Sequence, residues 1–389
     1  MKILIYCQHV LGIGHLFRTI EICRALKGND VVLVTGGPAV AADLPDHVRE
    51  FKLPQLKMDS SFKGLYASRS ETAIDQVKDM RRKLFYELFQ KEQPDLFIIE
   101  LYPFGRKAFR FELDPVLRGI REKQLSCWNV ICSVRDILVE KEDQQKHELR
   151  AVKTLNRYFD AVLVHADPRI VRLDETFLRF DQIVIPVVYT GFVAPKPSAH
   201  ARRKFRKKLG MDGSEIYIVA SAGGGSVGYP LLESVIEAFK RLKAENPKLL
   251  HIFTGPFIGE KLSKKLRRIA GPGVRIDVFS CDFLSYLAAA DLSISMGGYN
   301  TSMNILATGV PALVWPFPQN REQRLRAQRL AESGALRVLN DSDLQPQRLV
   351  KIMHGALSQP RRGSAGVDLD GAGNTAKWLQ SRAERGIKR

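Results

Sequence analysis

Short apolar runs alternate with longer amphipathic stretches along most of this 389-residue chain, and this alternation constrains the fold more than any other feature. Strands of parallel sheets are buried on both faces and are joined by crossover helices, so they read as short apolar runs between helical patterns. We therefore expect an α/β protein. In the first half, strands are expected at 2–7, 31–35, 96–100, 130–134, 161–165 and 183–186.

The same pattern starts again in the second half, with strands expected at 216–221, 250–254, 274–278, 292–295 and 312–314. Two doubly wound, Rossmann-like domains in tandem follow from this repetition. We expect an N-terminal domain at 1–192, a basic interdomain linker at 193–208, a second domain at 209–358, and a C-terminal loop and helix at 359–389. Ligands of such sheets bind at the carboxyl ends of the strands, so the loops there are the candidates for function.

A glycine-rich loop follows the strand expected at 216–221 and leads into a helix. Glycines let backbone N–H groups approach a phosphate, and a helix N-terminus adds partial positive charge. The spacing G-x-G-x-x-G also occurs in dinucleotide-binding loops, but these need an acidic residue at the end of the next strand, which here ends with Phe253-Thr254-Gly255-Pro256. We therefore expect a phosphate ligand other than NAD; a tight turn without ligand is the alternative.

A second glycine loop, Gly12-Ile13-Gly14-His15, follows the first strand and precedes a helix that contains Arg18. The ordinary pKa of histidine suits a general base near neutral pH, so His15 is the candidate base. Glu100 ends the strand at 96–100, where its carboxylate can orient His15 and stabilise the protonated ring. The alternatives are a structural histidine in a turn and a solvated carboxylate.

A third loop begins with Gly297-Gly298-Tyr299-Asn300-Thr301, between a strand and a short helix. With these residues, the stretch 279–334 resembles the donor-binding region of the MurG-like glycosyltransferases, family 28, which have the GT-B fold. The stretch 12–26 resembles the first loop and helix of the same group, and 101–106 resembles its branch of predicted glycosyl transferases.

The resemblance implies a nucleotide-diphosphate sugar in the C-terminal domain and an acceptor in the N-terminal domain. Residues matched to the donor are Gly223, Gly224, Gly225, Ser226, Phe279, Ser280, Gly297, Gly298, Tyr299, Asn300, Thr301, Asn304, Glu322 and Gln323. His15 matches the histidine of the family's first loop. At Asn304 the family usually carries glutamate, whose carboxylate accepts from both ribose hydroxyls; an amide has one acceptor oxygen, so ribose binding is expected to differ.

The expected activity is metal-independent, inverting transfer of a hexosyl-type sugar, UDP-linked, to a glycan or lipid-linked acceptor, with no cofactor. Backbone N–H groups of the glycine turns would take the place of a metal. On the acceptor side we place Gly12, Gly14, Arg18, Arg106, Arg135 and Asp136. A nucleotide-sugar hydrolase or epimerase on the same scaffold is the first alternative, and a non-catalytic protein that binds a nucleotide sugar or nucleic acid is the second.

The net charge of +18 admits nucleic acid, an anionic membrane face or phosphorylated small molecules as partners. Its basic clusters contain almost no aromatic residues for base stacking, so nucleic acid is not expected. The segment 202–208 suits peripheral contact with an anionic membrane. The five cysteines are odd in number and form no C-x-x-C pair, and no apolar run reaches the ~20 residues of a membrane span, which together favour the cytoplasm.

Overall fold

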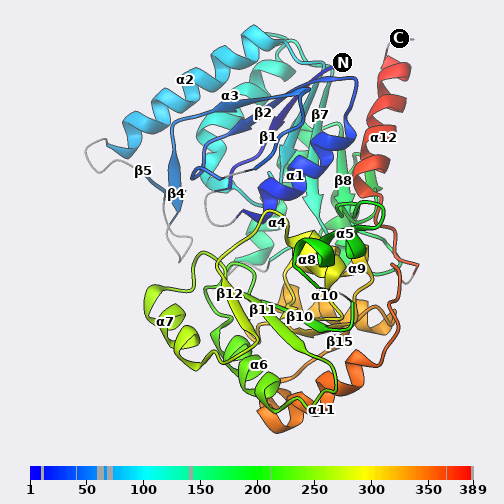
Figure 1. Cartoon of the computed structure of the whole chain (residues 1–389). Helices are drawn as coiled ribbons and strands as arrows, with labels where there is room; N and C mark the ends of the chain where they lie inside the picture. Colours follow the sequence, from blue (N-terminus) through cyan, green and yellow to red (C-terminus); the bar gives the residue numbers. More distant parts are fainter. Residues whose placement is uncertain are drawn as a thin grey trace. The chain divides into compact units, whose positions relative to one another are not determined.

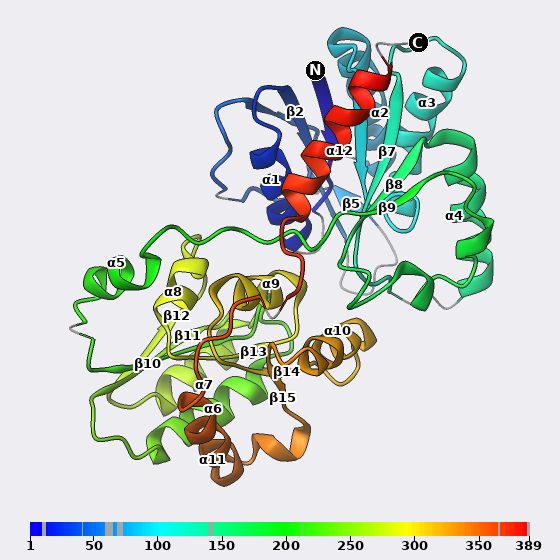
Figure 2. The same ribbon diagram turned by 90° about the vertical axis from the view of Figure 1, so that its right-hand side faces the viewer.

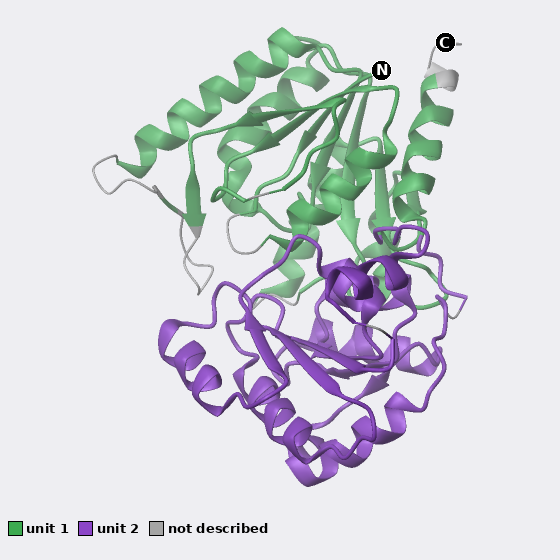
Figure 3. Ribbon diagram, viewed as in Figure 1, with its two compact units in different colours: residues 1–193, 370–389 green, residues 194–369 purple. Residues whose placement is uncertain are grey.

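The computed structural model describes residues 1–9, 13–40, 42–58, 65–67, 73–139, 143–211, 213–364 and 366–386. The chain divides into two compact units (Figure 3). Unit 1 comprises Met1–Val193 together with Asp370–Arg389, and unit 2 comprises Ala194–Leu369. The C-terminal segment therefore returns to the first unit instead of ending in the second. An isolated antiparallel bridge between Val193 and Asp370 marks the place where the chain leaves unit 1 and re-enters it.

Unit 1 is built on a seven-stranded parallel sheet in the order β3-β2-β1-β6-β7-β8-β9 (Figure 1). Its strands are β1 (Lys2–Tyr6), β2 (Asp30–Thr35), β3 (Val48–Lys52), β6 (Leu96–Glu100), β7 (Asn129–Arg135), β8 (Ala161–His165) and β9 (Val187–Tyr189). A short antiparallel pair, β4 (Leu56–Met58) and β5 (Leu65–Ala67), stands apart from this sheet. The helices are α1 (Gly14–Ala25), α2 (Ile74–Glu92), α3 (Arg110–Arg121), α4 (Gln144–Tyr158) and α12 (Gly371–Gly386).

Apolar residues cover both faces of the unit 1 sheet, as expected for parallel strands. On one face, alternate strand residues such as Ile3 and Ile98 pack with the buried side of α1 and with Leu379 of α12. Figure 2 shows α12 running beside α1. On the other face, Phe85 of α2 contacts Tyr6 and Phe97, with ring centroids 5.3 and 6.0 Å apart. The sheet is thus enclosed between two layers of helices, which confirms the predicted α/β class.

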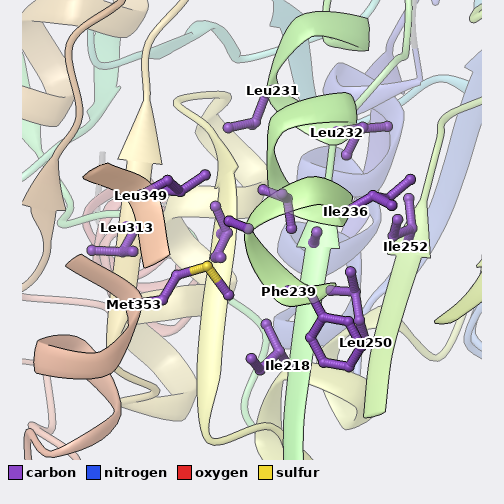
Figure 4. Packing of buried hydrophobic residues seen from close by; sticks show 14 of the residues in the cluster. Ile218, Leu231, Leu232, Ile236, Phe239, Leu250, Ile252, Leu313, Leu349 and Met353 are labelled. Carbon is purple, nitrogen blue, oxygen red and sulfur yellow. The ribbon is translucent and has the colours of Figure 1, made fainter. Parts of the chain in front are cut away.

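Unit 2 repeats this plan with six parallel strands in the order β12-β11-β10-β13-β14-β15. They are β10 (Ile216–Ser221), β11 (Lys248–Phe253), β12 (Val274–Asp277), β13 (Leu292–Met296), β14 (Ala312–Trp315) and β15 (Arg337–Val338). The helices are α5 (Ala201–Lys208), α6 (Tyr229–Arg241), α7 (Glu260–Ile269), α8 (Phe283–Ala289), α9 (Tyr299–Thr308), α10 (Arg321–Glu332) and α11 (Pro346–Leu357). Leucines and Phe239 of α6 pack with Met353 of α11 over the strands (Figure 4).

The second half of the segment expected to be a linker, 193–208, is the helix α5 of unit 2. Phe205 of α5 packs on Tyr286 of α8, with ring centroids 4.7 Å apart. Arg202 and Arg206 donate to the carboxylate of Asp291 at 2.6 and 3.2 Å, and both also donate to the carbonyl of Ala289. These two guanidinium groups are therefore engaged within the unit, so fewer basic side chains of 202–208 are available for the expected contact with an anionic membrane.

Two local expectations about strands were wrong. The strand expected at 183–186 is β9, which begins only after Pro186, because proline has no N–H to donate to a sheet. The edge strand β3 was missed, since only Val48 of its sequence Val-Arg-Glu-Phe-Lys is buried and the stretch reads as polar. No helix among the described residues has the length and apolar character that crossing a membrane requires.

Candidate functional site

Each sheet has one point where neighbouring strands are followed by connections that run in opposite directions. In unit 1 this switch point lies between β1 and β6, and in unit 2 it lies between β10 and β13. A crevice opens at the carboxyl ends of the strands at such a point, and ligands of doubly wound sheets bind there. The loops found from the sequence follow these four strands, so each unit presents its candidate residues at its own switch point.

The structure brings His15, Arg18 and Glu100 together at the unit 1 switch point. Nδ1 of His15 lies 2.8 Å from Oε1 of Glu100, and the guanidinium of Arg18 donates to the same oxygen. Glu100 ends β6 and its side chain is 1% exposed, whereas that of His15, in the first turn of α1, is 19% exposed. The carboxylate is thus enclosed, while the imidazole keeps a surface toward solvent.

These contacts fix the protonation of the pair. Burial lowers the pKa of His15 to about 4, although Glu100 acts in the opposite direction, and Arg106 and Arg18 lower it further. Burial disfavours the charge on Glu100, but His15 and Arg18 outweigh it and hold the pKa of this carboxyl below its usual range. An ionised carboxylate only accepts, so Nδ1 of the neutral ring carries the hydrogen and Nε2 presents a lone pair. This is the state that a general base needs.

The other candidates of unit 1 lie near this pair or outside the described residues. Gly14 is the first residue of α1, and Gly12 lies outside the described residues. Arg106 acts electrostatically on both His15 and Glu100, and precedes a short 3-10 helix. Arg135 ends β7, the neighbour of β6, and Asp136 follows it fully buried.

Sequence reasoning missed a row of polar side chains beside the pair. His165, at the end of β8, is fully buried; its Nε2 lies 2.8 Å from Oγ of Ser133 and its Nδ1 lies 2.9 Å from Oγ1 of Thr190. Burial lowers the pKa of His165 to about 3, so the ring is neutral. The signal was present in the sequence, because His165 ends an apolar strand, Thr190 follows one and Ser133 lies two residues before the end of β7.

In unit 2, the loop after β10 packs backbone against backbone on the loop after β11. Gly225 has φ +89°, and a Cβ there would lie 2.3 Å from the carbonyl oxygen of Thr254. Gly255 meets the carbonyl of Gly223 at the same distance, and the N–H of Phe257 donates to Gly224 at 2.9 Å. Gly223, Gly224 and Ser226 are exposed. The glycines at 225 and 255 are thus required by the fold, and the exposed ones remain for a ligand.

The turn after β13 is held by a buried arginine that sequence reasoning missed. Arg326 of α10 donates to the carbonyl of Gly297 at 3.1 Å and to Glu322 at 2.8 Å, and it lies 5.4 Å from the centre of the Tyr299 ring. Tyr299 and Glu322 are 5% and 7% exposed. Their side chains therefore support the turn from inside the unit, whereas the sequence placed them at a ligand. The spacing of Glu322 and Arg326, four residues apart on a helix, was the available signal.

Gly298 caps the N-terminus of α9 in open space, with no atom of its described neighbourhood within 4 Å of a Cβ placed there. Asn300, Thr301 and Asn304 follow in α9 and are half-buried. In α10, Gln323 accepts from the N–H of Phe317 at 3.2 Å through its side-chain oxygen, which leaves its NH₂ group for a ligand. Neither α6 nor α9 has a side-chain hydrogen bond at its N-cap residue, Gly228 or Gly298.

Phe279 and Ser280, which the resemblance matches to the nucleobase of the donor, follow β12 at the same edge of the sheet. Phe279 is 44% exposed, and Oγ of Ser280 accepts from the N–H of Asp282 at 3.1 Å. The N–H of Gly255 donates to the carbonyl of Val278 at 2.9 Å, which joins this turn to the glycine loops. The predicted residues of unit 2 thus lie on the loops after β10, β12 and β13 and on the helices α9 and α10.

Comparisons with known proteins agree with this arrangement. Residues 220–365 match the glycosyltransferase family 28 C-terminal domain, so this part of the chain is a domain of that family. A relative is the UDP-N-acetylglucosamine--N-acetylmuramyl-(pentapeptide) pyrophosphoryl-undecaprenol N-acetylglucosamine transferase of Caldanaerobacter subterraneus subsp. tengcongensis, 30% identical over 160 residues. The match spans 40% of this chain and 43% of the relative, so the chain matches less than half of that protein's length.

Two solved structures resemble the whole chain. The calicheamicin glycosyltransferase CalG4 has a TM-score of 0.62 at 16% identity, and the match covers 98% of each chain. The UDP-GlcNAc 2-epimerase of Methanocaldococcus jannaschii has a TM-score of 0.61 at 12% identity, with 98% of this chain and 100% of the other covered. Likeness at such identity shows the fold, and the fold is GT-B.

Proposed function

We propose that the chain is a glycosyltransferase that moves a hexosyl group, with inversion, from a nucleotide-diphosphate sugar, UDP-linked, to a hydroxyl of a glycan or lipid-linked acceptor. The observation that carries this proposal is the pair of glycine turns at the unit 2 switch point, within the segment that matches family 28. Each turn precedes a helix whose N-terminus has no side-chain cap bond. Two such N-termini favour a ligand with two phosphate groups.

In this proposal the donor lies across the loops at the carboxyl edge of unit 2. Backbone N–H groups of Gly224 and Gly298 and the two helix N-termini stabilise the charge of the leaving diphosphate without an obligatory metal. The N–H of Gly223 instead donates to Oγ of Ser221 at 3.1 Å and holds the turn. Asn304 and the NH₂ group of Gln323 face the sugars. Because the amide of Asn304 offers a single acceptor oxygen, it can accept from ribose less well than a carboxylate.

The acceptor hydroxyl loses its proton to Nε2 of His15 as its oxygen forms a bond with the anomeric carbon. The bond from that carbon to the diphosphate oxygen breaks at the same time, and the electron pair leaves with the nucleotide diphosphate. One displacement of this kind inverts the anomeric configuration. Glu100, already hydrogen-bonded to Nδ1, stabilises the imidazolium that forms.

The donor is identified first, by thermal shift with UDP-, GDP-, dTDP- and CDP-sugars, because a ligand that binds only the folded protein raises its melting temperature. We expect a UDP-sugar to give the largest shift. Products are then analysed with and without glycan and lipid-linked acceptors. Free sugar released without acceptor, at the rate seen with it, would instead indicate the hydrolase, and an isomerised nucleotide sugar would indicate the epimerase.

The role of the base is tested with His15→Ala. This variant should bind the donor as the wild type does and lose at least ~100-fold in kcat, because a general base contributes about that much or more. His354→Ala is the matched control, since His354 is exposed on α11 of unit 2. A kcat of His15→Ala close to that of the wild type would show that His15 is not the general base.

A further inference from the structure

A cavity of about 230 Å³ lies in unit 1, at the carboxyl ends of β1 and β2 and alongside β3. Most of its wall is apolar, with Leu16, Ile20, Leu33, Val40, Leu44 and Leu53 among the lining residues. An apolar cavity of about 150 Å³ accepts a benzene molecule, so this one has room for roughly a bicyclic ring. The polar residues of its lining restrict the ligand further.

One wall of the cavity is closely packed. A Cβ at Gly36 would lie 2.3 Å from Nη1 of Arg81, and one at Gly37 would lie 2.5 Å from the carbonyl oxygen of His9. Arg81 is fully buried and makes two hydrogen bonds to Glu112, at 2.6 and 2.8 Å. The turn after β2 is therefore closely packed against these groups, with the cavity beside it.

His9 gives the cavity a specific polar requirement. Its Nε2 lies 2.8 Å from the carbonyl oxygen of Pro38, and a carbonyl only accepts, so Nε2 carries the hydrogen. Burial lowers the pKa of His9, which keeps the ring neutral, so Nδ1 is left as an acceptor. The ring is 4% exposed, and Nδ1 is buried without a hydrogen-bond partner in the described part of the chain. A buried acceptor in this state favours a ligand with a donor.

The remaining polar side chains, Thr35, Glu50, Lys52 and the uncharged Gln55, add no strong net charge. The hydroxyl of Thr35 donates to Oε1 of Glu50 at 2.7 Å, and Nζ of Lys52 lies 3.2 Å from Oε2 of the same carboxylate. The charges of Glu50 and Lys52 thus compensate each other at the edge of the cavity. The lining therefore matches an uncharged ligand with an apolar body and one hydroxyl or N–H donor.

We propose that this cavity binds the apolar part of the acceptor, a ring or branched chain that carries a hydroxyl donor. Helix α1 connects it to the candidate base, because Leu16 and Ile20 line the cavity while His15 and Arg18 contact Glu100. That the ligand is the acceptor rests on the proposed function; that the cavity binds such a molecule does not.

The test uses two probes that differ in one donor, 2-naphthol and 2-methoxynaphthalene, titrated into the whole chain by calorimetry. The wild type should bind 2-naphthol with one-to-one stoichiometry and at least ~5-fold more tightly than the methyl ether, the factor expected of one hydrogen bond. His9→Phe should abolish this difference. Absence of saturable binding by 2-naphthol, or equal affinity of the wild type for both probes, would overturn the proposal.

Location is tested by filling the cavity with Leu44→Trp and, separately, Ala42→Phe. Each variant that melts as the wild type does should bind 2-naphthol at least ~10-fold more weakly, because the added ring takes the ligand's space. Leu178→Trp is the control, since Leu178 is 77% exposed and outside the cavity. Unchanged affinity in the folded filling variants would overturn the site. The thermal shift with nucleotide sugars measures donor binding independently of this cavity. A failure of the proposed function can therefore be told apart from a failure of the cavity to bind 2-naphthol.

Discussion

At the scale of single residues, one carboxylate oxygen decides the state of the candidate base. Oε1 of Glu100 accepts hydrogen bonds from both Nδ1 of His15 and the guanidinium of Arg18. The positive charge of Arg18 already balances the carboxylate, so the ring is held by Glu100 without being forced to carry a proton. The glycine before His15 and the strand-end position of Glu100 could be predicted from the sequence. The hydrogen bond from Arg18 to Glu100 could not be predicted, because nothing in the sequence shows that the side chain of Arg18 turns inward.

This arrangement predicts an unusual pH dependence of kcat. Because burial lowers the pKa of His15 to about 4, the ring stays neutral and able to accept a proton throughout the range above that value. Activity should therefore be flat from pH 8 to about 5.5 and should be lost only as the pH falls toward 4. The kcat of the wild type with saturating donor measures this. Half-maximal kcat near pH 6.5, the ordinary pKa of histidine, would contradict it.

At the scale of elements, loops after parallel strands make the candidate sites, and helices behind them hold the loops. The glycine turns after β10 and β13 were predicted from the glycines that follow each expected strand, and at Gly225 only glycine permits the close approach seen. The support of Gly297 by α10 was not predicted. A charged side chain on a helix normally faces solvent, and whether Arg326 is buried depends on packing that the local sequence does not contain.

The support by α10 can be tested with Arg326→Lys. Lysine keeps the charge but has no planar group to bond Gly297 and Glu322 at once and to lie over Tyr299. We expect a loss of stability of about 2 kcal/mol, from hydrogen bonds of a buried charged group, and donor binding at least several-fold weaker. Arg329→Lys on the same helix is the control, because Arg329 is 40% exposed in its ion pair with Glu332. Donor affinity equal in both variants would show that the turn does not depend on Arg326.

At the scale of the whole molecule, the chain forms two units of the same architecture, and unit 1 is completed by a helix that follows unit 2 in the sequence. The repetition of strand and helix patterns predicted two such domains. The return of α12 to unit 1 was not predictable, because an amphipathic helix shows that it has an apolar face but not which partner covers it. The same limit applies to α5, whose basic residues suggested a linker.

Removal of residues 370–389 tests what the returning helix contributes. Leu379 of α12 is fully buried in the core of unit 1, so its loss exposes the apolar face of α1. Calorimetry should show a lower melting temperature for the transition of unit 1, by several degrees. The transition of unit 2, identified as the one that UDP shifts upward, should not change. A truncated chain whose two transitions both match those of the full chain would contradict this role of α12.

Titration of UDP into Gly298→Ala tests whether a nucleotide diphosphate binds at the turn between β13 and α9. A Cβ at Gly298 meets no described atom and the backbone has an ordinary φ of −67°, so the variant should melt as the wild type does. Gly355→Ala, equally uncrowded in α11, is the control. We expect Gly298→Ala to bind UDP at least ~10-fold more weakly than both the wild type and this control, because the methyl group enters space that the phosphates need. Equal affinity for UDP in all three proteins would contradict it.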